Sequence, residues 1–100
     1  MATESSKTGT MVARAIKALD GHVLTGLSNA ELAKALNTSP ANVTRYLNTL
    51  IEEGLAVKLD NGCFALSIGM AQIAQKVANK LANAQAQINE VAQRISAGSY

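Results

Sequence analysis

Two helix-start signals separated by a very short link constrain this chain more than any other feature. Ser28 followed by Glu31 predicts a capping box, in which each residue's side chain accepts a hydrogen bond from the other's backbone amide. Ser39 followed by Pro40 predicts the start of a second helix. Proline has no backbone N–H, and this costs nothing in the first turn of a helix, where the N–H groups have no partner within the helix. Asn37 suits the left-handed exit of the first of these helices. So short a link, from Asn37 to Ser39, excludes an antiparallel helix pair and predicts a helix-turn-helix.

The segments around this motif have the patterns of a first helix and a β-hairpin. Apolar residues recur with helical spacing over 11–19, and the second helix of the motif is expected over 40–53. Over 55–59 the leucines and the valine take one face of a strand, 60–62 suits a turn, and 63–66 returns as a second strand. Residues 22–27 are expected to connect the first two helices and to add one extended segment. A hairpin directly after a helix-turn-helix is a wing, so the predicted fold is mainly α with a small β-hairpin wing.

The rest of the chain predicts a terminal arm, a long helix and a tail. Residues 1–10 are small and polar and are expected to form a flexible arm, which leaves 11–68 for the winged helix-turn-helix. Residues 69–96 are rich in Ala, Gln, Lys and Leu and predict one dimerisation helix, followed by a tail over 97–100.

An apolar seam along this long helix predicts a coiled coil. Its members alternate steps of four and three residues, as in heptads. They are Met70, Ala74, Val77, Leu81, Ala84, Ile88, Val91 and Ile95. A core with three aromatic residues and no Trp is thin, which also favours a partner surface. The flanking positions carry too few opposed charges to set orientation, so parallel and antiparallel pairs and higher oligomers all remain open.

The helix over 40–53 has an outward face suited to DNA. Burying Val43, Leu47 and Leu50 leaves a small polar face on which Arg can pair with guanine and Asn with adenine. Tyr46 is expected to pack at the edge of the core. The candidate DNA-binding residues are Ser39, Ala41, Asn42, Thr44, Arg45, Asn48 and Thr49 on this helix, with Lys58 and Asn61 on the wing.

The charge balance leaves a second interpretation open. The whole chain has a formal net charge of +2, but up to Leu66 its basic and acidic residues balance. Few phosphate contacts per copy are therefore expected, with useful affinity only from two copies together. The alternative is a protein-interaction module that uses the winged helix and the coiled coil without binding DNA.

Other classes of protein lack the residues they need. The chain has one Cys and one His, Cys63 and His22, so we expect no internal disulfide, no metal site and no cofactor. Without an oriented His or a Gly-rich phosphate loop, we do not expect an enzyme. The sequence shows neither a secretion signal nor an apolar run of roughly 20 residues, which predicts a cytoplasmic, nucleoid-associated protein of a bacterium or phage with no membrane contact.

Residues 12–75 resemble the N-terminal DNA-binding domain of IclR-type bacterial transcriptional regulators. The residues that carry the resemblance are Ala15–Leu19, Leu27–Ser28, Glu31–Ala33, Val43–Leu47, Leu50, Gly54–Leu55 and Phe64–Gly69, the last with Phe for the family's Tyr and one inserted residue. The resemblance implies a dimer on a palindromic or repeated operator, with Thr44 and Arg45 contacting DNA. The family's C-terminal ligand-binding domain has no counterpart in this sequence, so no ligand sensing is implied. Together these features predict a sequence-specific, repressor-like binder of double-stranded DNA that acts as a homodimer or higher oligomer.

Overall fold

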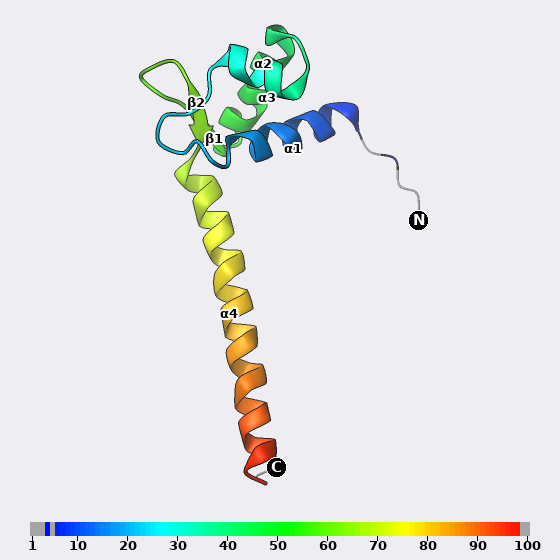
Figure 1. Cartoon of the computed structure of the whole chain (residues 1–100), viewed down its shortest axis with the longest axis vertical. Coiled ribbons are helices and arrows are strands. Elements are labelled where there is room, and N and C mark those ends of the chain that lie inside the picture. The colour runs from blue at the N-terminus through cyan, green and yellow to red at the C-terminus, as the bar shows by residue number, and fades with distance from the viewer. Residues whose placement is uncertain (1–3, 5, 99–100) are drawn as a thin grey trace. The chain divides into compact units, whose positions relative to one another are not determined.

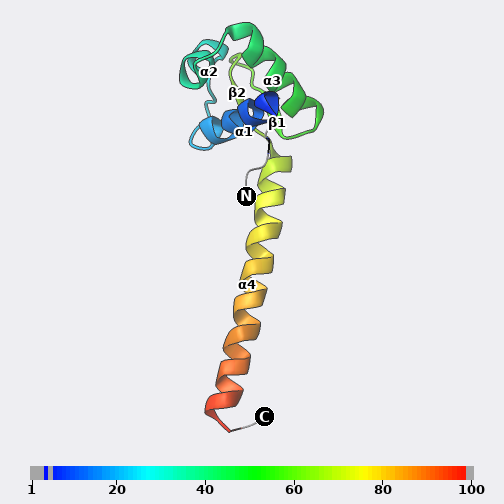
Figure 2. The ribbon, with the colours of Figure 1, turned by 90° about the vertical axis from the view of Figure 1, so that its right-hand side faces the viewer.

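The chain divides into two units, Met1–Met70 and Ala71–Tyr100. The computed structural model describes residue 4 and residues 6–98. The first unit contains α1 (Lys7–Leu19), α2 (Asn29–Leu36), α3 (Pro40–Glu52), β1 (Ala56–Lys58) and β2 (Phe64–Leu66) (Figure 1). Helix α4 (Ile68–Ser96) begins at the end of the first unit and runs without a break through the second (Figure 2).

Helix α1 begins four residues earlier than the sequence pattern predicts. The Ser6 hydroxyl caps it by accepting from the Gly9 amide at 3.1 Å, and the Thr10 hydroxyl donates to the Ser6 carbonyl at 2.9 Å. The predicted flexible arm is therefore wrong for residues 7–10, because a cap sustains a first turn whose exposed side chains show no apolar period. The rest of the arm at 1–3 and 5, and the end of the predicted tail at 99–100, lie outside the described residues.

The predicted caps of α2 and α3 are confirmed. The Glu31 amide donates to the Ser28 hydroxyl at 3.1 Å, and the Ser28 amide donates to the Glu31 carboxylate at 3.0 Å. The backbone amide of Ser28, and then its hydroxyl, hold the pKa of Glu31 below its ordinary value. Asn37 adopts the left-handed conformation with φ 51°, and Ser39 caps α3. Helix α3 ends at Glu52, one residue before the predicted end.

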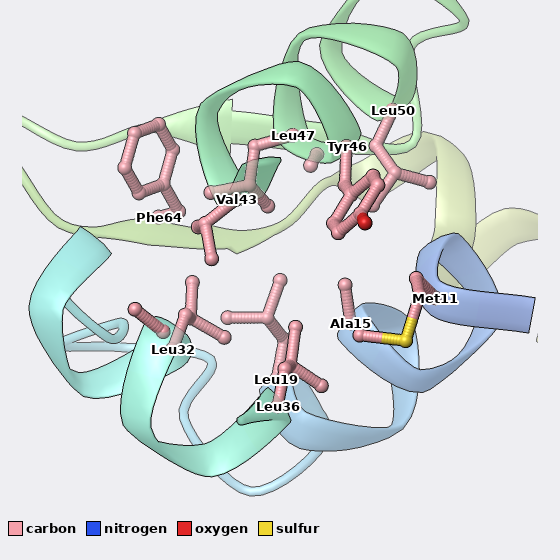
Figure 3. Close-up of a cluster of buried hydrophobic side chains, with 12 residues drawn as sticks. Met11, Ala15, Leu19, Leu32, Leu36, Val43, Tyr46, Leu47, Leu50 and Phe64 are labelled. Carbon is pink, nitrogen blue, oxygen red and sulfur yellow. The ribbon is translucent and has the colours of Figure 1, made fainter. Parts of the chain in front are cut away.

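The core lies between α3 on one side and α1 with α2 on the other (Figure 3). Val43, Leu47 and Leu50 of α3 point toward the side chains of α1 and α2, and Val43, Leu19 and Leu32 are fully buried. The remaining members of the core are Met11, Ala15, Ala33, Leu36, Tyr46, Ala56 and Phe64. This packing holds α3 by one face and leaves its opposite face outside.

The β-hairpin pairs β1 with β2 in the register Ala56 to Leu66. Leu27 forms an isolated bridge with Phe64, which confirms one extended segment in the connection after α1. The alternation of large and small side chains over 55–59 does not identify the buried face of the strand. The small Ala56 is 2 % exposed, whereas the larger Val57 is 40 % exposed. Strand β1 follows α3 after a tight turn and contacts it. Because the two elements lie so close together, the small side chain of Ala56 is the one that enters the core.

Helix α4 begins two residues before Met70 and includes a glycine in its first turn. A Cβ on Gly69 would lie 2.6 Å from the Gly54 carbonyl oxygen, so the close approach of these two backbones requires glycine. The Ser67 hydroxyl donates to the same carbonyl and accepts from the Met70 amide at 3.3 Å. These contacts fix the first turn of α4 to the turn that follows α3. Among the described residues, no helix combines the length and apolarity required to cross a membrane.

Candidate nucleic-acid interface

The turn between α2 and α3 is closed by backbone and side-chain hydrogen bonds. The Asn37 amide donates to the Ala33 and Lys34 carbonyls, and the Thr38 amide donates to the Ala33 carbonyl at 3.0 Å. The Asn42 amide then donates to the Ser39 hydroxyl at 3.2 Å. Hydrogen bonds therefore hold both ends of the turn, and the direction of α3 relative to α2 is set by local contacts.

Asn29, which sequence reasoning did not single out, connects the starts of the two helices. Its side-chain amide donates to the Thr44 hydroxyl at 2.9 Å and to the Pro40 carbonyl at 3.2 Å. The Thr44 hydroxyl in turn donates to the Pro40 carbonyl at 3.1 Å. The available signal was a polar residue near the start of each of two helices joined by a short link. The Thr44 hydroxyl retains capacity to accept one further hydrogen bond.

Arg45 and Asn48 are the candidate residues best placed to reach a partner. Both are exposed on the face of α3 opposite the core, and within residues 6–98 their side chains form no hydrogen bond or ion pair. Ala41, Thr44 and Thr49 are exposed on the same helix. The Thr49 hydroxyl donates to the Arg45 carbonyl at 3.1 Å. This face offers one cation and one amide, flanked by short side chains.

Asn42 and Ser39 are already engaged inside the protein. The Asn42 side chain is half-buried and donates to the Thr38 hydroxyl at 3.0 Å, while the Ser39 hydroxyl caps α3. The expectation that Asn42 projects freely like Arg45 is therefore wrong, because the Asn42 amide closes the turn. Tyr46 is 9 % exposed and packs in the core, close to the predicted position at its edge.

The wing presents one cation, and its asparagine is used to shape the loop. The Lys58 ammonium lies 5.8 Å from the centre of the Phe64 ring, a cation–π contact on an exposed side chain. Asn61 donates to the Thr25 carbonyl at 3.1 Å and accepts from the Cys63 amide at 2.9 Å. Asn61, a candidate DNA-binding residue, is thus used to hold the loop, and Lys58 is the wing residue open to a ligand.

The far half of α3 borders a hollow that also includes the start of α1. Its lining residues are Thr8, Arg45, Tyr46, Asn48, Thr49 and Glu52. Thr8 was missed because the sequence pattern assigned it to a flexible arm. The Glu52 carboxylate disfavours a phosphate at this end, whereas the positive end of the helix dipole lies at Ser39 and Pro40. A nucleic acid is therefore favoured over the part of α3 that precedes Glu52, which includes Arg45 and Asn48.

Helix α4 exposes nearly all of the predicted seam. Met70 is half-buried, and every described residue beyond it is exposed. Along the seam, exposure is 54 % for Val77, 67 % for Leu81, 62 % for Ile88, 54 % for Val91 and 61 % for Ile95. Large apolar side chains are thus arranged on one helix face without cover from the described residues.

Comparison with known proteins supports the architecture. The family described as winged helix-turn-helix DNA-binding matches residues 26–56. A structure of a mutant of Lactococcus lactis ZitR is similar, with a TM-score of 0.53 and 20% identity over 94% of this chain and 68% of that chain. No curated protein sequence matches. The predicted winged helix-turn-helix is confirmed, and the family match supports the predicted DNA-binding function.

Proposed function

We propose that this chain is a regulator of transcription that binds specific double-stranded DNA with α3 in the major groove. The observation that carries the proposal is the pair Arg45 and Asn48, exposed one turn apart on a helix whose other face lies in the core. Arginine can donate two hydrogen bonds to one guanine, and asparagine can pair in the same manner with adenine. The resemblance to IclR-type regulators independently assigns Thr44 and Arg45 to DNA.

The start of α3 supplies the contact to the DNA backbone in this proposal. Ala41 is small and exposed, so the first turn of the helix can approach a phosphate closely. Lys58 on the wing adds a second positive group. Because acidic and basic residues balance up to Leu66, these contacts are few, and the dependence of affinity on salt should be shallow for one copy.

Self-association through α4 is the second part of the proposal, and the exposed seam supports it. Burying the exposed part of each large side chain from Val77 to Ile95 is favourable by about 1 to 2 kcal/mol, or about 10 to 20 kcal/mol for the ten in a pair. Association itself costs roughly 4 to 15 kcal/mol. A pair also doubles the number of phosphate contacts, which compensates for the neutral DNA-binding unit.

Replacing Arg45 by Ala tests the DNA-binding proposal. Removing one bidentate arginine costs about 1 to 3 kcal/mol per site, so affinity for a selected duplex should fall at least about fivefold while the fold is retained. Lys76→Ala is the matched control, because it removes an equal charge from an exposed position on α4. Affinity should be measured by fluorescence anisotropy at fixed salt. Equal losses in both variants would show that Arg45 contributes only its charge, and no loss in either variant would favour the protein-interaction module.

A further inference from the structure

We propose that two copies of α4 pair antiparallel, in a register centred between residues 82 and 83, so that the small residues of one seam face the large residues of the other. This inference rests on the self-association proposed above. It concerns the direction and register of the pair, which the flanking charges alone do not set.

The two small residues of the seam argue against a parallel pair. In a parallel pair each seam residue faces its own counterpart, so Ala74 would face Ala74 and Ala84 would face Ala84. The neighbouring layers would hold two Leu81 or two Ile88 side chains. Helices held apart by the large layers would leave voids at the alanine layers, and such voids are destabilising because protein interiors are close-packed.

The antiparallel register removes both alanine layers and uses the whole seam. Small side chains then lie opposite larger ones, which allows the two faces to interdigitate. The four layers, each occurring twice, are Met70 with Ile95, Ala74 with Val91, Val77 with Ile88, and Leu81 with Ala84. A shift by one heptad in one direction brings Ala74 opposite Ala84, and in the other direction it leaves Met70 and Ala74 without partners.

A recess on α4 supports this register. It is apolar and is lined by Ala84, Gln87, Ile88 and Val91, the four residues that form one hole of a knobs-into-holes seam. The small Ala84 side chain creates the depth. With the pair centred between residues 82 and 83, Val77 of the second copy is the knob that enters it.

The distribution of charge along α4 also favours the antiparallel arrangement. Its first half carries Lys76 and Lys80, while its second half carries Glu90 and Arg94, which pair with each other at 2.6 Å. Antiparallel packing places the two lysines of one copy along the neutral half that contains Glu90 of the second copy. Parallel packing would bring four lysines together, which is unfavourable because like charges repel.

The register fixes the separation of the two points at which α4 leaves the winged helix-turn-helix units. Met70 lies opposite Ile95 of the second copy, so the two Met70 residues are about 38 Å apart along the axis at 1.5 Å per residue. This is close to one turn of DNA, about 34 to 36 Å, the spacing of successive half-sites in the major groove.

Site-directed crosslinking tests the direction and register. In a Cys63→Ser background, Ala74→Cys and Val91→Cys place one thiol each on the seam, and the two variants are refolded separately and as a mixture. A short thiol-reactive crosslinker should give a covalent dimer in the mixture and none in either variant alone, with mass spectrometry identifying one copy of each variant. Circular dichroism checks that both variants retain α4.

The possible results separate this inference from the proposal beneath it. Covalent dimers from each variant alone would overturn antiparallel pairing. A dimer by sedimentation that gives no covalent product in any sample would overturn the register. If both the unaltered chain and the Cys63→Ser protein sediment as monomers, self-association is refuted. The antiparallel pairing is then refuted as well.

Discussion

Truncation of Leu81 to Ala should weaken self-association without unfolding the protein. Leu81 is 67 % exposed on α4, so the folded chain loses no core contact when the side chain is shortened. In the proposed pair, two such side chains become buried, each contributing about 1 to 2 kcal/mol. The loss of about 2 to 4 kcal/mol corresponds to a rise in the dimer dissociation constant of roughly 30-fold to 700-fold. Alanine favours helix, so α4 itself should persist.

Sedimentation equilibrium over a range of concentrations measures this effect directly. Gln93→Ala is the matched control, since Gln93 is exposed on the side of α4 opposite the seam and its truncation should leave the dissociation constant unchanged. Circular dichroism should show the same helix content for both variants. Equal dissociation constants for Leu81→Ala and the unaltered chain would refute the assignment of the seam as the interface.

Two further predictions concern the first unit. Gly26→Ala should lower the free energy of unfolding by about 2 to 4 kcal/mol, because φ is +69° and the new Cβ would lie 2.5 Å from the Phe64 carbonyl oxygen. Gly21→Ala is the control and should change the free energy of unfolding little, because nothing lies within 4 Å of the new Cβ. Chemical denaturation measures both variants, and similar free energies of unfolding would contradict the close approach of the wing to Gly26. Glu31→Gln should be less stable than the unaltered chain at neutral pH, and this difference should vanish as the pH falls below 4.5, the ordinary pKa of this carboxyl. The sign follows because a lowered folded-state pKa stabilises the ionised form, and that stabilisation is lost when Glu31 is protonated; thermal melts at neutral and low pH test it, and a constant difference would speak against the capping box.

The parts of the fold that could be predicted from the sequence are those encoded by neighbouring residues. The capping box at Ser28, the left-handed exit at Asn37 and the Ser39–Pro40 start are local signals, so they predicted the helix-turn-helix correctly. The start of α1 at Ser6 was also local, but it was hidden by exposed polar residues that show no apolar period.

The parts that could not be predicted depend on contacts between distant segments. The exposure of Val57 and the burial of Ala56 follow from the closeness of β1 to α3, which side-chain size along the strand does not report. Asn61 is held by Thr25, 36 residues away, so its use inside the protein was invisible in the sequence. The exposure of Arg45 and Asn48 on α3 was predicted, but the hydrogen bonds that engage Asn42 and Asn61 were not.

Selection of bound duplexes from a random pool of double-stranded DNA tests the proposed function most directly. The account predicts that the folded protein enriches a short sequence that recurs about one helical turn away, and that Arg45→Ala abolishes or alters this enrichment. A pool whose composition stays unchanged after repeated selection with the folded, unaltered chain would contradict sequence-specific DNA binding by α3.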